Sequence, residues 1–314
     1  MTGHIEIEPQ GPFSWTSALE VLGNFAPTRH HPQGSESDVT LAFPLDGSFA
    51  PVAIALRYRD GVLKGEVTGT EDTEAAARQV ARIFSLNHDG SGYPEVGLRD
   101  PALGRVMEAL PGLRPVCFTS PYETAAWGVI SQRISMTQAA ALKDRLIAEH
   151  GQPLEVGGRQ VHGFPEPERL LQVKEVPGLS SVKVERLRGV ARAALDGLLD
   201  PERLRALGDE AGPASLLQIP GIGPFWASGI YLRGCGIRDV FPEEPLSIAA
   251  LGHLHGLGDR PEAAKVAELT DAYRPFRMWV CFLLRVAAGR GLVPGVAGRE
   301  GSIRRGARGH PAEL

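Results

Sequence analysis

A short turn rich in proline and glycine lies between two apolar helical segments in the second half of the chain. Pro220 ends the first segment, and Pro224 suits the first position of a new helix. Gly221 and Gly223 allow backbone angles that a side chain would obstruct, so the turn can direct free backbone N–H groups outward. Because a helix N-terminus favours an anion, the pattern predicts a phosphate-binding hairpin with Ile222 buried between its helices. An ordinary helical hairpin is the alternative for so short a motif.

Two adjacent carboxylates, Glu243 and Glu244, stand immediately before Pro245. Pro245 suits the first position of a helix, which would make Glu244 the N-cap, and the helix dipole would help to keep that carboxylate ionised. A carboxylate held in this way can act as a general base or stabilise a nearby positive charge. Because glutamate is not a favoured cap, two solvated loop residues are the alternative.

A second polar cluster, Gln132, Arg133 and Ser135, lies at the end of a predicted helix that ends near Ile134. A guanidinium can stack on a flat ring and also contact phosphate, whereas Gln132 and Ser135 could simply cap helices.

A basic helix precedes the glycine turn and carries Lys183, Arg186 and Arg188. These cations can face phosphate, but a charge run of this kind is more often a solvated face.

The composition indicates a globular protein with enough chain for two or three domains. The chain has 314 residues, 43% of them hydrophobic and 22% charged, with a net charge of −4. This charge excludes a uniformly basic DNA coat but not a local basic face. We find no apolar run long enough for a membrane helix and no signal-peptide pattern at the N-terminus, which points to the cytoplasm and to no membrane partner. The isolated Cys117, Cys235 and Cys281 are expected in the core, without a disulfide framework.

The elements that must position these residues fall into two classes. Alternating apolar residues predict strands over residues 39–44, 52–58 and 62–67, with a turn at Asp60 and Gly61, followed by a helix over 73–84. We therefore expect a small α+β domain with an antiparallel sheet over residues 1–97.

From Asp100 onward the pattern is helical. Asp100 is a good N-cap for a helix through Leu110, and a capping box at Ser120 and Glu123 opens the next helix. Further helices are expected over residues 139–150, 167–173, 179–194 and 273–288. A basic tail over residues 296–314 is expected to be disordered and to add nonspecific attraction to DNA through Arg299, Arg304, Arg305 and Arg308.

Several motifs in this order resemble the helix-hairpin-helix DNA glycosylase superfamily, closest to bacterial 3-methyladenine DNA glycosylase II. The resemblance covers about residues 100–290 and includes the glycine turn, residues 132–135, residues 239–242 and the Tyr273-Arg274-Pro275 segment. It implies an α+β fold with a small N-terminal domain and a mostly helical body over residues 98–295. Two lobes, residues 98–115 plus 236–295 and residues 116–235, would make up that body.

The resemblance also implies roles for individual residues. The loop with Gln132, Arg133 and Ser135 would enter the minor groove of double-stranded DNA, with Arg133 as the inserted side chain. The hairpin residues would hold the DNA backbone: Pro220, Gly221, Ile222, Gly223 and Phe225. The base pocket would be lined by Phe225, Trp226, Trp279 and Arg285, with Arg285 where relatives often carry an aromatic residue.

The family's catalytic aspartate aligns with Pro245, so Glu244, one residue earlier and one methylene longer, is the candidate catalytic carboxylate. Phe225 stands where bifunctional relatives carry a lysine nucleophile, so we expect a monomeric, monofunctional enzyme that flips out and removes alkylated purines. No cofactor is required and no iron–sulfur cluster is expected. A monovalent cation would bind the backbone carbonyls of Leu217, Ile219 and Ile222. The alternatives are a catalytically impaired lesion-binding relative and, less directly, a hairpin used for protein contacts.

Overall fold

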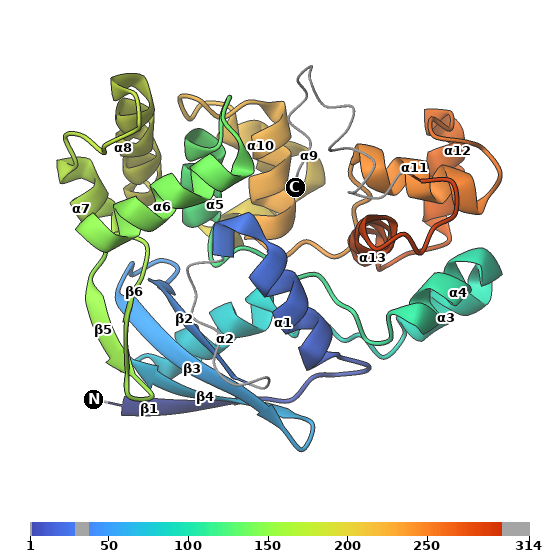
Figure 1. Cartoon of the computed structure of the whole chain (residues 1–314), viewed down its shortest axis with the longest axis horizontal. Helices are drawn as coiled ribbons and strands as arrows, with labels where there is room; N and C mark the ends of the chain where they lie inside the picture. The colour runs from blue at the N-terminus through green and yellow to red at the C-terminus, as the bar shows by residue number, and fades with distance from the viewer. Residues whose placement is uncertain (1, 29–37, 297–314) are drawn as a thin grey trace. The chain divides into compact units, whose positions relative to one another are not determined.

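The computed structural model describes residues 2–28 and 38–296 (Figure 1). The chain divides into two compact units. Unit 1 comprises residues 1–9, 19–87 and 116–236, and unit 2 comprises residues 10–18, 88–115 and 237–314. The predicted basic tail lies, from residue 297 onward, outside the described residues. Helices predominate and the strands are antiparallel, which confirms the predicted α+β class.

Unit 1 contains an antiparallel sheet with the strand order β1-β4-β3-β2. The predicted hairpin and the strand before it are confirmed, and the N-terminal strand adds an edge that the sequence pattern did not predict. Leu41, Ile54 and Val67 are paired across β2, β3 and β4 and are fully buried, so they form the core of one sheet face. The elements are β1 (Thr2–Ile7), β2 (Asp38–Pro44), β3 (Pro51–Arg59), β4 (Val62–Thr68) and α2 (Thr73–Ile83).

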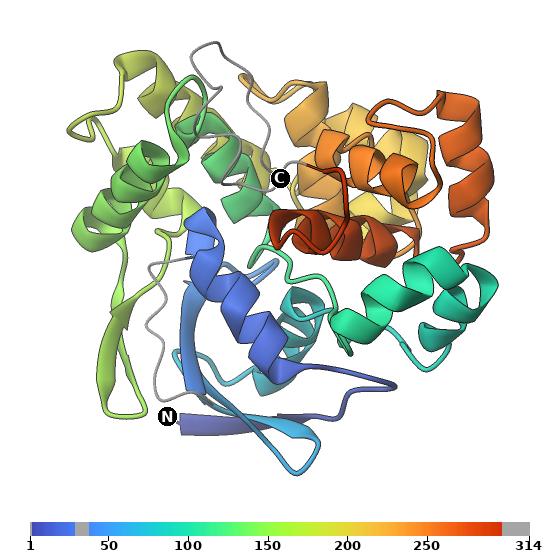
Figure 2. The same cartoon turned by 45° about the vertical axis from the view of Figure 1, so that its right-hand side comes forward.

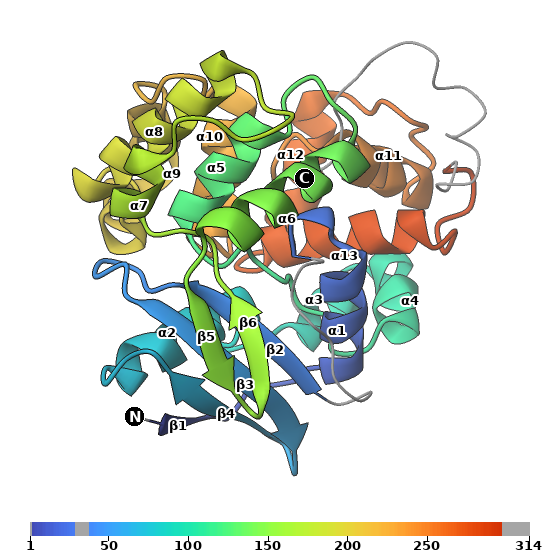
Figure 3. The same ribbon diagram turned by 60° about the vertical axis from the view of Figure 1, so that its left-hand side comes forward.

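The opposite sheet face is covered by a second hairpin, β5 (Pro153–Val156) and β6 (Arg159–His162), seen in front of the sheet in Figure 3. Side chains alternate across a strand, so Ala42 and Ala53 point away from Leu41 and Ile54 and pack against this hairpin. The sequence did not predict β5 and β6, because strands of four residues with mostly exposed side chains leave almost no period-2 signal.

The helices of unit 1 surround α5, all of whose residues are buried. A helix that is buried on every side lies at the centre of a packed core. The prediction that this helix runs to Ile134 is wrong, because it ends at Ile130 and a new helix begins at Met136. The helices are α5 (Pro121–Ile130), α6 (Met136–His150), α7 (Pro167–Gln172), α8 (Ser181–Leu195), α9 (Pro201–Leu216), α10 (Pro224–Gly229) and the π-helical turn η2 (Ile230–Gly234).

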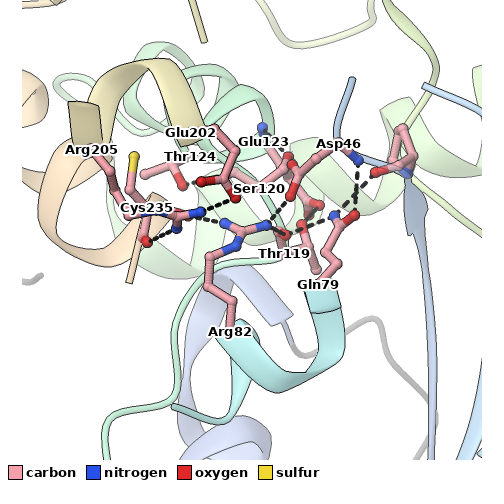
Figure 4. Close-up of polar contacts among 12 residues, drawn as sticks. Asp46, Gln79, Arg82, Thr119, Ser120, Glu123, Thr124, Glu202, Arg205 and Cys235 are labelled. Carbon is pink, nitrogen blue, oxygen red and sulfur yellow. Dashed lines mark hydrogen bonds and ion pairs between the residues drawn. The ribbon is translucent and has the colours of Figure 1, made fainter. Parts of the chain in front are cut away.

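A polar network joins the sheet to these helices inside unit 1 (Figure 4). Arg82 of α2 forms an ion pair with Asp46 and donates a hydrogen bond to the Thr119 carbonyl at 2.9 Å. Gln79 donates to the same carbonyl at 2.9 Å and accepts from the Asp46 backbone N–H at 2.8 Å. The buried arginine therefore has its donors satisfied, which is what makes its burial tolerable.

Asp46 predicts a pH dependence of stability. Burial raises its pKa to about 6, against the attraction of Arg82, so the folded chain binds a proton more tightly than the unfolded chain does. The free energy of unfolding should therefore fall as the pH rises from about 4 to about 6, by up to about 3 kcal/mol from this group. Urea unfolding at several pH values gives the free energy of unfolding of wild type and Asp46→Asn, and the contribution of Asp46 is the difference between their slopes against pH. Equal slopes for the two proteins would contradict this prediction.

Unit 2 consists of short helices in which Asp100 and Trp279 are central. Asp100 caps α4 by accepting from the Ala102 N–H at 3.0 Å, and it also accepts from the Tyr273 hydroxyl at 2.6 Å. Helices α11 and α13 lie side by side, as the orange and red ribbons in Figure 2 show. The elements are α3 (Pro94–Arg99), α4 (Pro101–Ala109), α11 (Pro245–Leu254), α12 (Ala263–Asp271) and α13 (Arg277–Gly289); α1 (Trp15–Asn24) has residues in both units.

The described part of the chain has no helix with both the length and the apolar character that a membrane span needs. Cys117, Cys235 and Cys281 are buried thiols, as predicted.

Candidate functional site

The glycine turn has the predicted form in unit 1. Helix α9 ends at Leu216 and α10 begins at Pro224. The Ile222 N–H donates to the Ile219 carbonyl at 3.0 Å, and both isoleucines are buried. Pro220 and Gly223 are exposed, so the bend presents backbone rather than side chains to solvent.

Gly221 is the residue of the turn that a side chain would strain most. Its φ is +93°, in the left-handed region that disfavours side chains. A Cβ built there would lie 2.7 Å from Cδ of Arg186, so α8 also packs closely on the turn.

Gly221→Ala should therefore lower the free energy of unfolding by about 1–2 kcal/mol and weaken any binding through the hairpin. Gly223→Ala is the matched control, because its φ is −97° and a Cβ at that position would meet no atom within 4 Å. Urea unfolding and binding to one duplex DNA measure both variants. Equal effects of the two substitutions would refute the special role of Gly221.

Gln132 connects the second polar cluster to the turn. Its side-chain N–H donates to the Gly221 carbonyl at 2.7 Å, and its side-chain oxygen accepts from the Arg186 guanidinium at 2.8 Å. Gln132 thus does more than cap a helix. Ser135, by contrast, is the N-cap of α6 in a capping box with Gln138, as the alternative interpretation proposed.

Lys183 lies inside this cluster rather than on a solvated basic face. Its ammonium donates to the carbonyls of Ile130 and Gln132, each at 2.7 Å. Burial, and then the nearby Arg186, lower the pKa of the Lys183 side chain. Arg186 is turned inward as well, whereas Arg188 pairs with Glu185 on the surface at 3.2 Å. No pattern in the sequence predicts these inward roles.

Arg133 is exposed and has a φ of +59°, which is unusual for a residue with a side chain. Within residues 2–28 and 38–296, its guanidinium has no hydrogen bond or ion pair. The loop therefore presents a free cation to solvent.

Two aromatic side chains adjoin the turn. Phe225 is 43% exposed, and its ring meets that of Trp226 edge to face with centroids 5.5 Å apart. Trp226 is half-buried and lies over Gly128 of α5, where a Cβ would come within 2.9 Å of the indole. An exposed aromatic ring of this kind offers a surface on which a base can stack.

Glu244 is the N-cap of α11 in unit 2, as predicted, and it is only 6% exposed. One carboxylate oxygen accepts from both the backbone N–H and the hydroxyl of Ser247, each at 2.6 Å. The other oxygen forms a 2.6 Å ion pair with Arg285 of α13. The interpretation of Glu244 as a solvated loop residue is wrong, whereas Glu243 is exposed.

The structure thus brings Glu244 and Arg285 together, while Trp279 lies elsewhere in unit 2. The Trp279 ring is 2% exposed and packs on Tyr93 and Phe276, with Arg114 above it at 4.9 Å. Arg285 and Trp279 therefore lie on different faces of α13.

The resemblance assigns a cation to three backbone carbonyls of the turn, and each of them keeps a lone pair. The Ile219 carbonyl accepts one hydrogen bond, from Ile222, and keeps a second lone pair. The carbonyls of Leu217 and Ile222 accept none within the described residues. A cation held there would add positive charge at the turn. Among the described side chains, no group of three or more His, Cys, Asp and Glu could hold a metal ion.

Comparison with known proteins places this arrangement in context. The chain is 24% identical over 217 residues to a DNA-3-methyladenine glycosylase of Bacillus subtilis, covering 67% of this chain and 71% of that protein. It is 33% identical over 168 residues to DNA-3-methyladenine glycosylase 2 of Escherichia coli, covering 52% of this chain and 56% of that protein. No protein-family model matches the chain.

A solved structure of a 3-methyladenine DNA-glycosylase from Archaeoglobus fulgidus has the same fold, with a TM-score of 0.72 and 23% identity, covering 90% of this chain and 97% of that one. The chain is therefore similar in sequence to bacterial 3-methyladenine DNA glycosylases, and it has the fold of the archaeal glycosylase.

Proposed function

We propose that this protein is a monofunctional DNA glycosylase that removes alkylated purines from double-stranded DNA. The observation that carries the proposal is Glu244, a buried carboxylate held at a helix N-terminus in a chain whose curated relatives are named as 3-methyladenine glycosylases.

The proposed chemistry needs few groups. A damaged nucleotide first leaves the base stack, which costs least when pairing is already impaired. Glu244 then stabilises the oxocarbenium-like sugar and directs a water molecule to it. An alkylated base that already carries a positive charge leaves without strong help from a general acid. Phe225 has no amine to form a Schiff base, so the strand stays intact.

The hairpin and the loop at Arg133 would hold the DNA. The exposed bend at Pro220 and Gly223 suits a phosphate, and the free guanidinium of Arg133 suits the space left by a displaced base. A monovalent cation on the carbonyls of Leu217, Ile219 and Ile222 would favour the same phosphate.

The bonds of Glu244 favour a second candidate, a lesion-binding relative that does not cleave. Ser247 and Arg285 occupy both carboxylate oxygens, and the ion pair offsets the negative charge that catalysis would use. A carboxylate has about four lone-pair sites, so these contacts do not prevent a further one.

Incubating the full chain with methylated duplex DNA separates the candidates. The glycosylase forms abasic sites that break only after alkali, whereas a lyase breaks the strand without it. The lesion binder forms no abasic sites but holds methylated duplex more tightly than unmodified duplex. Absence of both activities, with no salt-dependent DNA affinity, would reject both candidates.

A further inference from the structure

Lys183 lies at a position of α8 where a cation does not stabilise that helix. It lies in the first turn of α8, where the helix dipole disfavours a cation. Its ammonium instead points at the end of α5 and donates 2.7 Å hydrogen bonds to the carbonyls of Ile130 and Gln132. The last carbonyls of a helix lack partners within the helix and attract cations, so Lys183 caps α5 from a neighbouring helix.

The capped carbonyls lie just before the one exposed arginine of the loop. The φ angle of Arg133 is the rotation next to the peptide group that contains the Gln132 carbonyl. The hydrogen bond from Lys183 to that carbonyl therefore fixes the orientation of the peptide group before Arg133, whose unusual φ is +59°. A strained backbone angle persists only where its surroundings hold it.

The Gln132 side chain supplies a second anchor. Its bonds to Gly221 and Arg186 tie the same residue to the turn and to α8. With its backbone carbonyl and its side chain both held, Gln132 leaves Arg133 as the first residue free to project outward. The charge of Lys183 is used inside this assembly rather than on a phosphate.

We propose that Lys183 is a positioning residue that presets Arg133 for insertion into DNA, an inference that rests on the proposed function. The positioning role predicts two effects of losing Lys183, and loss of a phosphate contact would not produce both. Loss of Lys183 impairs the unstacking of DNA by Arg133, and it leaves the salt dependence of DNA binding unchanged.

The test uses the full chain and a duplex that carries a tetrahydrofuran abasic-site analogue beside 2-aminopurine, whose fluorescence rises on unstacking. Lys183→Met removes the donors, Lys183→Arg keeps them, and Arg133→Ala removes the inserted side chain. Arg192→Met is the matched control, because Arg192 is a surface cation on the same helix and pairs with Glu185. Thermal unfolding monitors the fold of each variant, and Lys183→Gln replaces Lys183→Met if the latter unfolds below the assay temperature.

We expect Lys183→Met to reduce the fluorescence rise about as much as Arg133→Ala does, and the double variant to lose no more than either single one. We expect Lys183→Arg and Arg192→Met to retain the rise. The slope of log affinity against log salt should be the same for Lys183→Met and wild type, whereas loss of a phosphate contact would lower it by about one.

Additive losses in the double variant, a lowered salt slope, or a normal fluorescence rise in Lys183→Met would each overturn the role of Lys183 while leaving the proposed function intact. A wild-type protein that neither unstacks the probe nor binds it in a salt-dependent way would reject the proposed function, and the positioning role with it.

Discussion

Glu244→Gln is expected to slow base release from methylated duplex DNA by about a hundredfold or more, the scale on which a positioned acid–base group acts. The amide keeps an oxygen that can accept from Ser247, so the cap of α11 survives. It carries no charge to stabilise a cationic sugar. Arg285 loses its ion-pair partner, but its side chain is 21% exposed and can turn to solvent. Single-turnover formation of alkali-labile sites measures the rate.

Glu243→Gln is the control for this experiment, because Glu243 is the preceding residue, has the same chemistry and is exposed. It should retain the wild-type rate. Equal rates for Glu244→Gln and wild type would remove Glu244 from the mechanism. A wild-type protein that binds the lesion without turnover would favour the binding candidate instead.

Lys143→Met is expected to lower the free energy of unfolding by about 3–5 kcal/mol. Lys143 of α6 and Glu123 of α5 form an ion pair in which each side chain is 1% exposed. Glu123 also accepts from Thr119, so its carboxylate is held deep in unit 1 (Figure 4). Removing the ammonium leaves a buried charge without its partner, and such a charge costs far more than the pair contributes. Urea unfolding measures the difference.

Lys265→Met provides the comparison, because Lys265 pairs with Glu268 at 2.6 Å on the surface and both side chains are well exposed. Its effect should stay within about 0.5 kcal/mol. Adding Glu123→Gln to Lys143→Met should restore part of the lost stability, since the buried charge is then gone. A small effect of Lys143→Met alone would mean that water reaches Glu123.

Local hydrogen bonds explain why several features were predictable from sequence. Asp100, Ser120 and Glu244 each cap a helix by accepting from a backbone N–H two or three residues ahead. Such a bond depends on the order of neighbouring residues and hardly on the rest of the fold. The turn at Gly221 was predictable for the same reason, because only a few residue types tolerate its backbone angles.

The errors arose where the local pattern was weak or was overruled by packing. Residues 131–134 continue the helical pattern of α5, yet the helix stops at Ile130. Arg133 has a φ of +59°, and Lys183, far along the chain, donates to the carbonyls of Ile130 and Gln132. The β5–β6 hairpin has little pattern of its own and is held by Ala42, Ala53 and Thr68 of the sheet.

The sequence by itself determined the fold class, the helix caps and the bend at residues 220–223, since these depend on residues close together in the chain. Only the tertiary structure decided which distant groups pair. Glu244 forms an ion pair with Arg285, 41 residues away, and Lys183 donates a hydrogen bond to the Ile130 carbonyl, 53 residues away. No local pattern predicts such pairs, because the free energy of a charge depends on its burial and its partner, and both are fixed only when distant helices pack together.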